Sequence, residues 1–576
     1  MRSARRPFTC LRCRRISTGI SIVNPKCAST PSQLRATPLP TTAAITRRPF
    51  HASSRLRYSS DQSLAAGRPT IAPKPNIDIK HIRQNPTLYE QTCFERNYIS
   101  QAAHPARILT LHEQWQALQR EARALREHSN LLRRQLANPA SVRGDEDTPS
   151  GQAVQHRARE TLLEEARQLK QQLSTIEADE DRLEGEIQAL ALALPNLTSD
   201  ATPRGDVPAL LGYINDHPEP HPRSSDRVWR SHVHVGSELG LLDFAGAATA
   251  SGWGWYYLVG EGAQLEQALV SYALDTARRH GWAQVSPPSM VYSHIAAACG
   301  FMPRDQNGET QVYAVAQSAS DRDRGRPELC LAGTAEIPLA GMRAGTTLDE
   351  PELPCRRVAA SRCYRAEAGA RGADTKGLYR VHEFTKVELF AWTRPGDEAA
   401  EVFDEMLDMQ TEILGSLGLH CRVLEMPSGD LGASATRKND IEAWFPSRAR
   451  RDNSATRTSS TASLGEKAEV AAGQEGQERE EGEEEDEEEE EEGWGEVTSA
   501  SICTDYQTRR LATRVRLGGA LTYPWTVNGT AMAVPRVLAA LLENGWDEET
   551  RTVAVPEVLR PYMDGMEKIG PKNRFR

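Results

Sequence analysis

Two long heptad patterns limit what this chain can fold into more than any other feature. Apolar residues recur at alternating spacings of three and four along residues 108–136 and again along 166–194, and only Ser129 and Glu180 interrupt the two seams. Each pattern predicts roughly 40 Å of helix at a rise of about 1.5 Å per residue. Residues 138–151 are rich in Pro, Gly and Asp and predict a turn between them. The pair therefore predicts an antiparallel coiled-coil hairpin, and a generic dimerisation coil is the alternative that heptads alone leave open.

Charge is distributed unevenly along the 576 residues, whose formal net charge is -10. Residues 1–60 contain twelve Lys or Arg and no Asp or Glu, and they are rich in Ser and Thr. This composition predicts a mitochondrial transit peptide, with a basic RNA-binding arm as the alternative, and a Pro-rich linker follows at 61–75. Residues 449–492 contain seventeen acids and five bases. Because such a run repels itself and buries no apolar surface, it predicts a disordered acidic insert. A tolerated insertion is the simpler interpretation of this segment, and a regulatory segment is the alternative.

Cysteine spacing and hydropathy narrow the class of protein further. The ten cysteines are scattered, and the pair Cys10 and Cys13 has no second pair at zinc-site spacing. We expect no disulfide framework, which suits a reducing compartment. No window approaches 18 continuous apolar residues, so we expect no membrane span.

Beyond the heptads, the pattern changes to mixed helices and strands, which predicts an α+β domain over 204–576. Residues 78–97 predict two short helices separated at Pro86, and they join the heptads in a helical region over 76–200, with its hairpin at about 104–194. Residues 258–279 predict an amphipathic helix. Residues 283–291 predict a strand that contains paired prolines.

The stretch RCYRAEAGARGADTKGLYRVHEFTKVE, residues 362–388, carries the clearest sign of chemistry. Alternating apolar residues flank a Gly-rich loop, which predicts an antiparallel hairpin. Arg365 can fork onto a phosphate, and the nearby Glu367 can hold an amine or a base edge. An ordinary surface hairpin is the alternative for an isolated R-x-E pair.

This stretch resembles motif 2 of class II aminoacyl-tRNA synthetases, and of seryl-tRNA synthetases in particular. Residues 258–291 resemble motif 1, and VNGTAMAVPRVLAALLENG at 527–545, followed by PEVLRPYMDG at 556–565, resembles motif 3. The resemblance covers about 76–576 without the insert. It implies an α+β fold in which an N-terminal antiparallel coiled-coil arm precedes a class II catalytic domain, a mostly antiparallel sheet flanked by helices.

The resemblance also implies the site residues. It implies catalytic roles for Arg365, Glu367 and Arg536. It implies ATP contacts from Arg365, Ala366, Glu367, Val381, His382, Glu383, Phe384, Glu496, Val497, Thr498, Ser499 and Arg536. It implies serine contacts from Thr334, Ala335, Glu336, Arg365, Glu388, Asn528 and Thr530, and Mg²⁺ held with ATP by Glu496 and Ser499. This chemistry is consistent with an in-line attack between two anions, which requires cations and rigid positioning. A buried carboxylate that awaits a hydroxyl would reject alanine strongly.

Some positions depart from the family pattern, namely Glu383, Asn439, Ile502 and Pro535. The resemblance nevertheless implies a seryl-tRNA synthetase that forms seryl-adenylate from serine and MgATP in the mitochondrial matrix and then charges tRNA(Ser). It implies a homodimer in which the arm of one subunit serves the other's active site. The candidate tRNA contacts are basic residues of the arm: Arg107, Arg120, Arg123, Arg126, Arg133 and Arg134. A solvated face of the coil explains these residues equally well. A non-catalytic paralogue and a ligase that charges a carrier protein are the rival functions.

Overall fold

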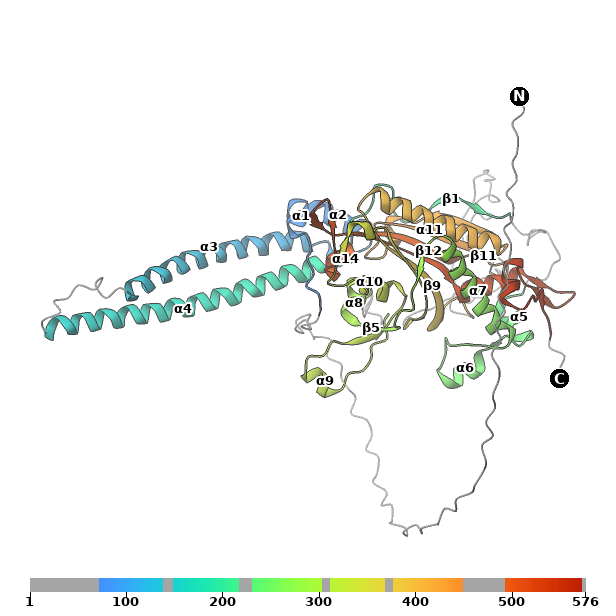
Figure 1. The fold of residues 1–576 in the computed structure, drawn as a ribbon, viewed down its shortest axis with the longest axis horizontal. Coiled ribbons are helices and arrows are strands. Elements are labelled where there is room, and N and C mark those ends of the chain that lie inside the picture. The colour runs from blue at the N-terminus through green and yellow to red at the C-terminus, as the bar shows by residue number, and fades with distance from the viewer. Residues whose placement is uncertain are drawn as a thin grey trace, which may run out of the picture. The chain divides into compact units, whose positions relative to one another are not determined.

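The computed structural model describes residues 72–137, 149–216, 230–302, 311–367, 377–448 and 493–571 (Figure 1). The expectations for the leader 1–60, for most of the linker 61–75 and for the acidic insert 449–492 lie outside the described residues.

The predicted hairpin is present as two long helices that lie side by side, α3 (His104–Ala137) and α4 (Pro149–Leu192) (Figure 1). Every seam position of both heptads is buried or half-buried, including Ser129 and Glu180. The predicted turn was partly wrong, because its last three residues belong to the first turn of α4. Proline is tolerated there since its missing N–H would have no partner in any case.

Two short helices pack against the base of the hairpin and confirm the expected break. They are α1 (Ile79–Gln84) and α2 (Pro86–Glu95), and the second begins with the proline. Their apolar residues form one core with the proximal ends of α3 and α4, in which Ile108 and Ile187 are buried.

An eight-stranded sheet forms the centre of the larger domain, in the order β1-β10-β11-β12-β15-β9-β8-β4. All neighbouring strands are antiparallel except β8 and β4. The strands are β1 (Ala209–Ile214), β10 (Cys421–Glu425), β11 (Arg437–Trp444), β12 (Trp494–Thr504), β15 (Trp525–Ala533), β9 (Glu383–Thr393), β8 (Cys355–Tyr364) and β4 (Ala283–Gln284). The predicted hairpin within 362–388 is confirmed, since β8 pairs with β9 in a register that places Tyr364 opposite Glu383.

Alternation along the central strands separates the two faces of this sheet. Val387 and Leu389 of β9 pack into a core with α7 (Glu261–Arg279), α11 (Asp397–Ser416) and α15 (Val534–Asn544). The next residue, Phe390, packs on the opposite face with α8 (Ser293–Ala298) and α10 (Glu336–Gly341). Successive side chains of a strand point to opposite faces, so Glu388 also lies on the α10 face.

Two boundaries in the motif 1 region differ from the predictions. The helix α7 begins at Glu261, because Tyr257–Leu258 forms the short strand β3 instead. The strand predicted over 283–291 is two strands in different sheets, β4 and β5 (Met290–Tyr292). The paired prolines separate them, since proline has no N–H to donate to a ladder.

Smaller elements complete the fold. The remaining strands are β2 (Leu242–Asp243), β6 (Leu329–Leu331), β7 (Thr347–Asp349), β13 (Arg514–Leu517), β14 (Ala520–Thr522), β16 (Trp546–Asp547), β17 (Thr552–Ala554) and β18 (Lys568–Ile569). The remaining helices are α5 (His232–Glu238), α6 (Phe244–Ala250), α9 (Ala319–Asp323), α14 (Tyr506–Leu511) and the 3₁₀ turns η1 (Ile99–Gln101), η3 (Glu350–Glu352), η5 (Ser428–Asp430) and η6 (Glu557–Tyr562).

The two chain ends that flank residues 449–492 meet at the edge of a β-ladder. Trp444 of β11 lies opposite Trp494 of β12, and their rings pack edge to face at 5.2 Å. The N–H of Phe445 also donates to the carbonyl of Gly493 at 2.8 Å. The ladder is therefore closed at the point where the acidic segment leaves and rejoins it.

Candidate active site

A cavity of about 310 Å³ opens where the β8–β9 hairpin meets β12, β15 and the first turn of α15. It is lined by Arg365, Glu367, Tyr379, Arg380, Val381, Phe384, Lys386, Glu496, Thr498, Ser499, Thr530, Ala533, Pro535 and Arg536. The cavity thus brings together, from three segments far apart in the sequence, most of the residues expected to contact ATP.

Arg365 enters the cavity directly after β8. Its guanidinium lies over the ring of Phe384, 5.3 Å from the centroid, and its backbone N–H donates to the carbonyl of His382 at 2.9 Å. Among the residues that the structure describes, no carboxylate forms an ion pair with Arg365. Glu367, in contrast, forms an ion pair with Arg380 and has a left-handed backbone with φ of 47°. One cation without an ion pair, beside an aromatic ring that lines the cavity, suits a nucleotide phosphate next to its base.

Arg536 enters the same cavity from the start of α15. Its guanidinium donates to the Glu496 carboxylate at 3.1 Å and to the Glu496 carbonyl at 2.9 Å. It also lies 4.5 Å from the ring centroid of Tyr379 and donates to the carbonyl of that residue at 3.2 Å. These contacts fix the direction of the guanidinium before any ligand arrives, which is the preorganisation that charge stabilisation requires.

A β-bulge places Glu496 and Ser499 on one face of β12. The register shifts between Ile441 and Glu442, so Val497 is an extra residue in the ladder. Residues three apart on a regular strand point to opposite faces, and the bulge cancels that difference. Val497 itself packs into the core on the far side. Both oxygen-bearing side chains therefore face the cavity.

Electrostatics around the bulge favour an ionised Glu496. Burial raises the pKa of Glu496, but the positive charges of Arg536, Lys438 and Arg365 outweigh that effect and hold the pKa below its ordinary value. Burial raises the pKa of the neighbouring Asp440, which pairs with Lys438 at 2.6 Å and has one oxygen without a hydrogen bond.

Gln410 of α11 holds β12 and β15 apart at the cavity. The ladder between these strands runs from Ala500 to Thr504, so the two strands separate before Ser499. The Gln410 amide donates to the carbonyl of Ser499 at 2.8 Å and to that of Thr530 at 2.9 Å. A helix side chain thus satisfies the backbone groups that the opened ladder leaves unpaired.

Behind the cavity, a second cluster is built around the buried carboxylate of Glu336 at the start of α10. Its Oε1 accepts from Gln507 at 2.6 Å and from Asn528 at 2.9 Å. Burial and the adjacent charge of Glu388 raise the pKa of Glu336 to about 7. Carboxylates so placed are suited to receive a small cation.

Lys386 connects this acidic cluster with the cavity. Its ammonium lies 2.5 Å from Glu388 and 3.3 Å from the hydroxyl of Thr530, and both charged side chains are nearly buried. Burial raises the pKa of Glu388, against the opposing effect of the Lys386 charge. Lys386 and Thr530 line the cavity, while Glu336 and Glu388 lie deeper.

The structure divides the residues expected from the sequence into three groups. Lining the cavity are Arg365, Glu367, Val381, Phe384, Glu496, Thr498, Ser499, Thr530 and Arg536. Clustered behind it are Thr334, Ala335, Glu336, Glu388 and Asn528, which are all buried. Outside the lining are Ala366, His382, Glu383 and Val497. The ring of His382 either accepts from the hydroxyl of Tyr313 or donates to the carbonyl of Arg365. The carboxylate of Glu383 lies near the guanidinium of Arg362.

Sequence reasoning missed several residues that shape the site. Lys386 could have been found, because it alternates with Phe384 and Glu388 on one strand face. Gln507, Gln410 and Tyr379 gave no local signal, since their roles depend on partners more than 30 residues away in the chain.

The described residues add two plain findings on ligands and membranes. Within the described ranges, no three His, Cys, Asp or Glu side chains gather as a metal-binding group. Nor does any helix in that part of the chain have the length and apolar character needed to cross a bilayer.

Comparisons with known proteins agree with this architecture. Residues 313–545 match the tRNA synthetase class II core domain (G, H, P, S and T), and residues 77–198 match the seryl-tRNA synthetase N-terminal domain. The chain is 40% identical over 405 residues to the mitochondrial serine–tRNA ligase of Saccharomyces cerevisiae. This alignment covers 70% of this chain and 78% of that relative. It is 35% identical to the mitochondrial serine–tRNA ligase of Mus musculus, over 80% of this chain and 76% of that relative. The seryl-tRNA synthetase of Pyrococcus horikoshii, solved with ATP, superposes with a TM-score of 0.69 at 29% identity and covers 86% of this chain and 100% of its own.

The antiparallel sheet, the motif hairpin and the two arginines in one cavity define a class II aminoacyl-tRNA synthetase core. The N-terminal helical hairpin and the similarity to serine–tRNA ligases over 70% and 84% of the chain narrow the assignment: the chain belongs to the seryl-tRNA synthetase family. The fold class predicted from the sequence is confirmed.

Proposed function

We propose that this protein is a mitochondrial serine–tRNA ligase that activates serine with ATP and transfers the seryl group to tRNA(Ser). The juxtaposition of Arg365 and Arg536 in one cavity, directly in front of the buried carboxylates Glu336 and Glu388, is the observation that carries this proposal. Two cations suit a triphosphate, and a buried acidic cluster suits an ammonium and a hydroxyl.

In the first half-reaction, a serine carboxylate oxygen attacks the α-phosphorus of ATP, and the bond to the leaving diphosphate breaks. Arg365 holds the α-phosphate and the serine carboxylate, which would otherwise repel each other. Arg536 binds the γ-phosphate, in a direction fixed by Glu496 and Tyr379. Phe384 offers its ring to the adenine, and Glu367 contacts the base edge.

Serine is selected in the cluster behind the cavity. Thr334 and Glu336 receive the α-ammonium group, and Glu388 with Thr530 receives the side-chain hydroxyl. Asn528 donates to Glu336 at 2.9 Å and so leaves the second carboxylate oxygen for the ligand. Alanine would leave buried polar groups unpaired, whereas threonine would be excluded by size.

Glu496 and Ser499 are the residues that would hold Mg²⁺ together with the triphosphate. The donor set fits this ion, because both side chains offer hard oxygen atoms from one face of β12 and Glu496 is kept ionised. When bound, the ion would neutralise charge on the β- and γ-phosphates.

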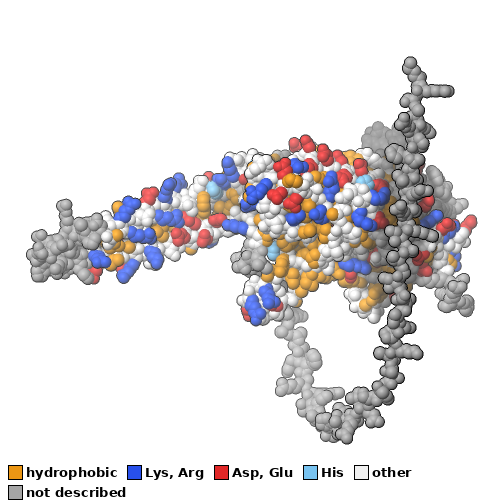
Figure 2. Space-filling view, viewed as in Figure 1, with side chains coloured by type: hydrophobic (Ala, Val, Ile, Leu, Met, Phe, Trp, Pro, Cys, Tyr) orange, Lys and Arg blue, Asp and Glu red, His pale blue; other side chains and the backbone are white. Residues whose placement is uncertain are grey.

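The helical arm is the proposed site of tRNA binding. Arg107 and Arg126 hold the hairpin together, since they pair with Glu186 at 3.0 Å and Glu177 at 3.2 Å. The side chains of the four other candidate arm arginines are exposed: Arg120, Arg123, Arg133 and Arg134. Figure 2 shows basic side chains along the hairpin, and they suit contacts to phosphates and to RNA shape rather than to base sequence.

We also propose that the protein forms a homodimer. Large apolar side chains are exposed around the motif 1 segment, including Met290, Tyr292 and Met302, and Figure 2 shows apolar side chains gathered on the face where β5 lies. Contiguous apolar surface of this kind favours association. Sedimentation at several concentrations tests it.

The mitochondrial matrix is the proposed location, with residues 1–60 as a cleaved leader. The acid-free, Arg-rich composition of this segment supports import. Imaging of the chain with and without residues 1–60 tests the assignment.

Serine-dependent ATP–pyrophosphate exchange, followed by charging of tRNA(Ser), tests the function. The account predicts both activities. Binding of tRNA without exchange would support a non-catalytic paralogue, and exchange without charging would support a ligase for a carrier protein.

A further inference from the structure

The short helix α14 (Tyr506–Leu511) contacts both the base of the helical arm and the amino-acid cluster. It follows β12, the strand that carries Glu496 and Ser499. Its residues are largely buried, and their side chains reach in two directions. None of the residues expected from the sequence to contact ATP or serine lies in α14.

Toward the arm, α14 is attached through Arg510. The buried guanidinium donates to the carbonyl of Leu192 at 3.2 Å and to that of Leu194 at 3.3 Å. Leu192 is the last residue of α4 and Leu194 lies two residues beyond it, where helical partners run out and a cation is favoured. The Arg510 guanidinium also lies 3.3 Å from the ring centroid of Tyr506, one turn earlier in α14.

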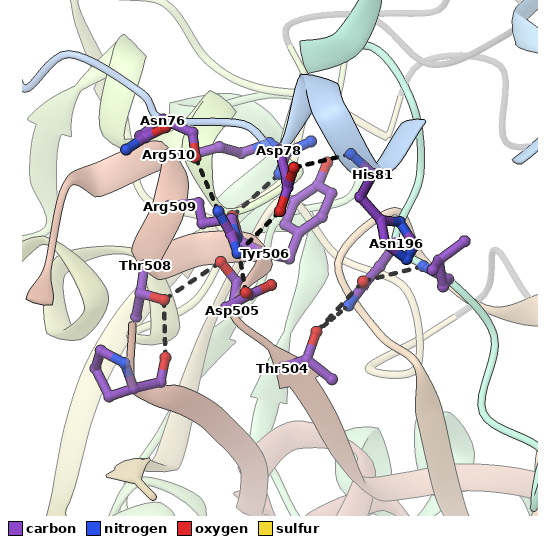
Figure 3. A network of polar contacts seen from close by, with 12 residues as sticks. Asn76, Asp78, His81, Asn196, Thr504, Asp505, Tyr506, Thr508, Arg509 and Arg510 are labelled. Atoms are coloured by element: carbon purple, nitrogen blue, oxygen red, sulfur yellow. Dashed lines mark hydrogen bonds and ion pairs between the residues drawn. The ribbon is translucent and has the colours of Figure 1, made fainter. Parts of the chain in front are cut away.

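Neighbouring contacts reinforce this attachment. Asn196, just beyond α4, donates to the carbonyl of Cys503 at 3.0 Å and to the hydroxyl of Thr504 at 2.9 Å (Figure 3). Arg509 pairs with Asp505 at 2.6 Å and reaches the carbonyl of Asn76 at 3.3 Å. The start of α14 is therefore fixed to the arm base on two sides.

Toward the amino-acid cluster, α14 presents Gln507, which is completely buried. The Gln507 Nε2 donates to Glu336 at 2.6 Å, and its Oε1 accepts from the Thr526 hydroxyl at 2.8 Å. An ionised carboxylate only accepts hydrogen bonds, so the amide nitrogen faces Glu336 and the amide oxygen accepts from the hydroxyl. The contact is thus fixed in orientation as well as in distance.

We propose that α14 is a positioning element for amino-acid binding: Arg510 anchors it to the end of α4, and Gln507 holds the Glu336 carboxylate in the place that receives the α-ammonium of serine. The proposal rests on the serine-binding role proposed above for Glu336. Gln507 acts through Glu336 and needs no contact with the substrate.

The charge environment of Glu336 makes this role measurable. Five titratable or charged groups face it: Glu388 and Lys386 of β9, Arg365, Cys299 beyond α8 and Cys503 of β12. Burial and Glu388 raise the pKa of Glu336 to about 7, whereas Gln507 lowers it by donating to the ionised form. Loss of this donor should therefore raise the pKa further and leave less ionised carboxylate at neutral pH.

The experiment compares Gln507→Met, Arg510→Lys and their double variant with wild type in ATP–pyrophosphate exchange between pH 6 and 8.5. Thr508→Val is the matched control, because Thr508 lies on the same helix and donates to Pro524, away from Glu336. We expect Gln507→Met to raise the KM for serine about ten-fold or more at pH 7, as for a lost hydrogen bond to a charged group, with the KM for ATP changed less than about two-fold. The rise of kcat/KM for serine with pH should move to higher pH by about one unit.

Arg510→Lys should change the serine KM in the same direction, by about two- to five-fold. The guanidinium uses Nη2 for the arm carbonyls and Nη1 for the carbonyl of Tyr506, and a single ammonium cannot keep both sets of contacts. The double variant should be no worse than Gln507→Met alone, since both changes act through one contact. Thr508→Val should match wild type.

A serine KM and pH profile that stay at wild-type values in Gln507→Met would overturn the proposal, as would equal rises in both KM values. Additive effects in the double variant would contradict the path through Gln507. A wild-type protein without serine-dependent exchange would instead refute the proposed function.

Discussion

The ion pair between Lys386 and Glu388 allows a quantitative test of the amino-acid cluster. Their charged atoms lie 2.5 Å apart, with side chains 10% and 2% exposed. Removing one partner of a buried pair typically costs about 3–5 kcal/mol, because the other charge is left uncompensated, whereas replacing both with apolar or neutral groups is often nearly neutral. Lys386→Met should therefore lower the free energy of unfolding by about 3–5 kcal/mol at pH 7.5.

The loss of unfolding free energy in Lys386→Met should depend on pH, because Glu388 can take up a proton once the ammonium of Lys386 is removed. Its pKa is already raised by burial and would rise further without the ammonium. Each pH unit below that pKa should recover up to about 1.4 kcal/mol. The double variant Lys386→Met/Glu388→Gln should lie within about 1–2 kcal/mol of wild type and lack serine-dependent exchange.

Guanidinium denaturation of the full chain, followed by tryptophan fluorescence at pH 7.5 and 5.5, measures these differences as shifts of the midpoint. Wild type at each pH is the control. A loss below about 1 kcal/mol for Lys386→Met, or a double variant less stable than Lys386→Met, would refute this description of the pair.

Three further predictions concern other parts of the chain. Replacing 449–492 by a short turn should leave exchange activity near wild type, because Phe445 and Gly493 already meet across the ladder, and a large loss in the exchange assay would show that the segment acts in catalysis. The double variant Arg133→Ala/Arg134→Ala should raise the KM for tRNA and reduce the slope of log affinity against log salt by about 1–2. ATP–pyrophosphate exchange should be unchanged in this variant. An unchanged salt slope in filter binding would count against tRNA contacts at these two arm residues. The pKa of Glu336 is raised to about 7, so its contribution to the stability of the fold is present at low pH and is lost as the pH rises toward 7. Serine binding, in contrast, needs the ionised carboxylate. Serine should therefore raise the melting temperature more at pH 8 than at pH 6.

Periodic features of the sequence predicted the fold well. The two heptads led to α3 and α4 with every seam position at least half-buried, and alternation on both sides of a Gly-rich loop led to β8 and β9. The errors fell at boundaries. The first turn of α4 and the divided strand at 283–291 depend on proline geometry and on which partner strand is available, and neither is written in a local pattern.

The site was predictable where a motif carried it and not where tertiary contacts did. Arg365 and Arg536 were found from their motifs, and they line one cavity. The bulge at Val497 and the amide of Gln410 could not be read from the sequence, because each depends on how β12 meets its neighbours. Gln507 and Glu336 are 171 positions apart, and only the folded chain brings them within 2.6 Å.

Neutralising the two arginines of the cavity tests the central claim most directly. Arg365→Met and Arg536→Met keep the length of each side chain and remove its charge, so ATP–pyrophosphate exchange with serine measures what the two guanidinium groups contribute. The account predicts that each variant loses at least about a hundred-fold in kcat/KM while folding normally. Exchange at the wild-type rate in either folded variant would contradict it.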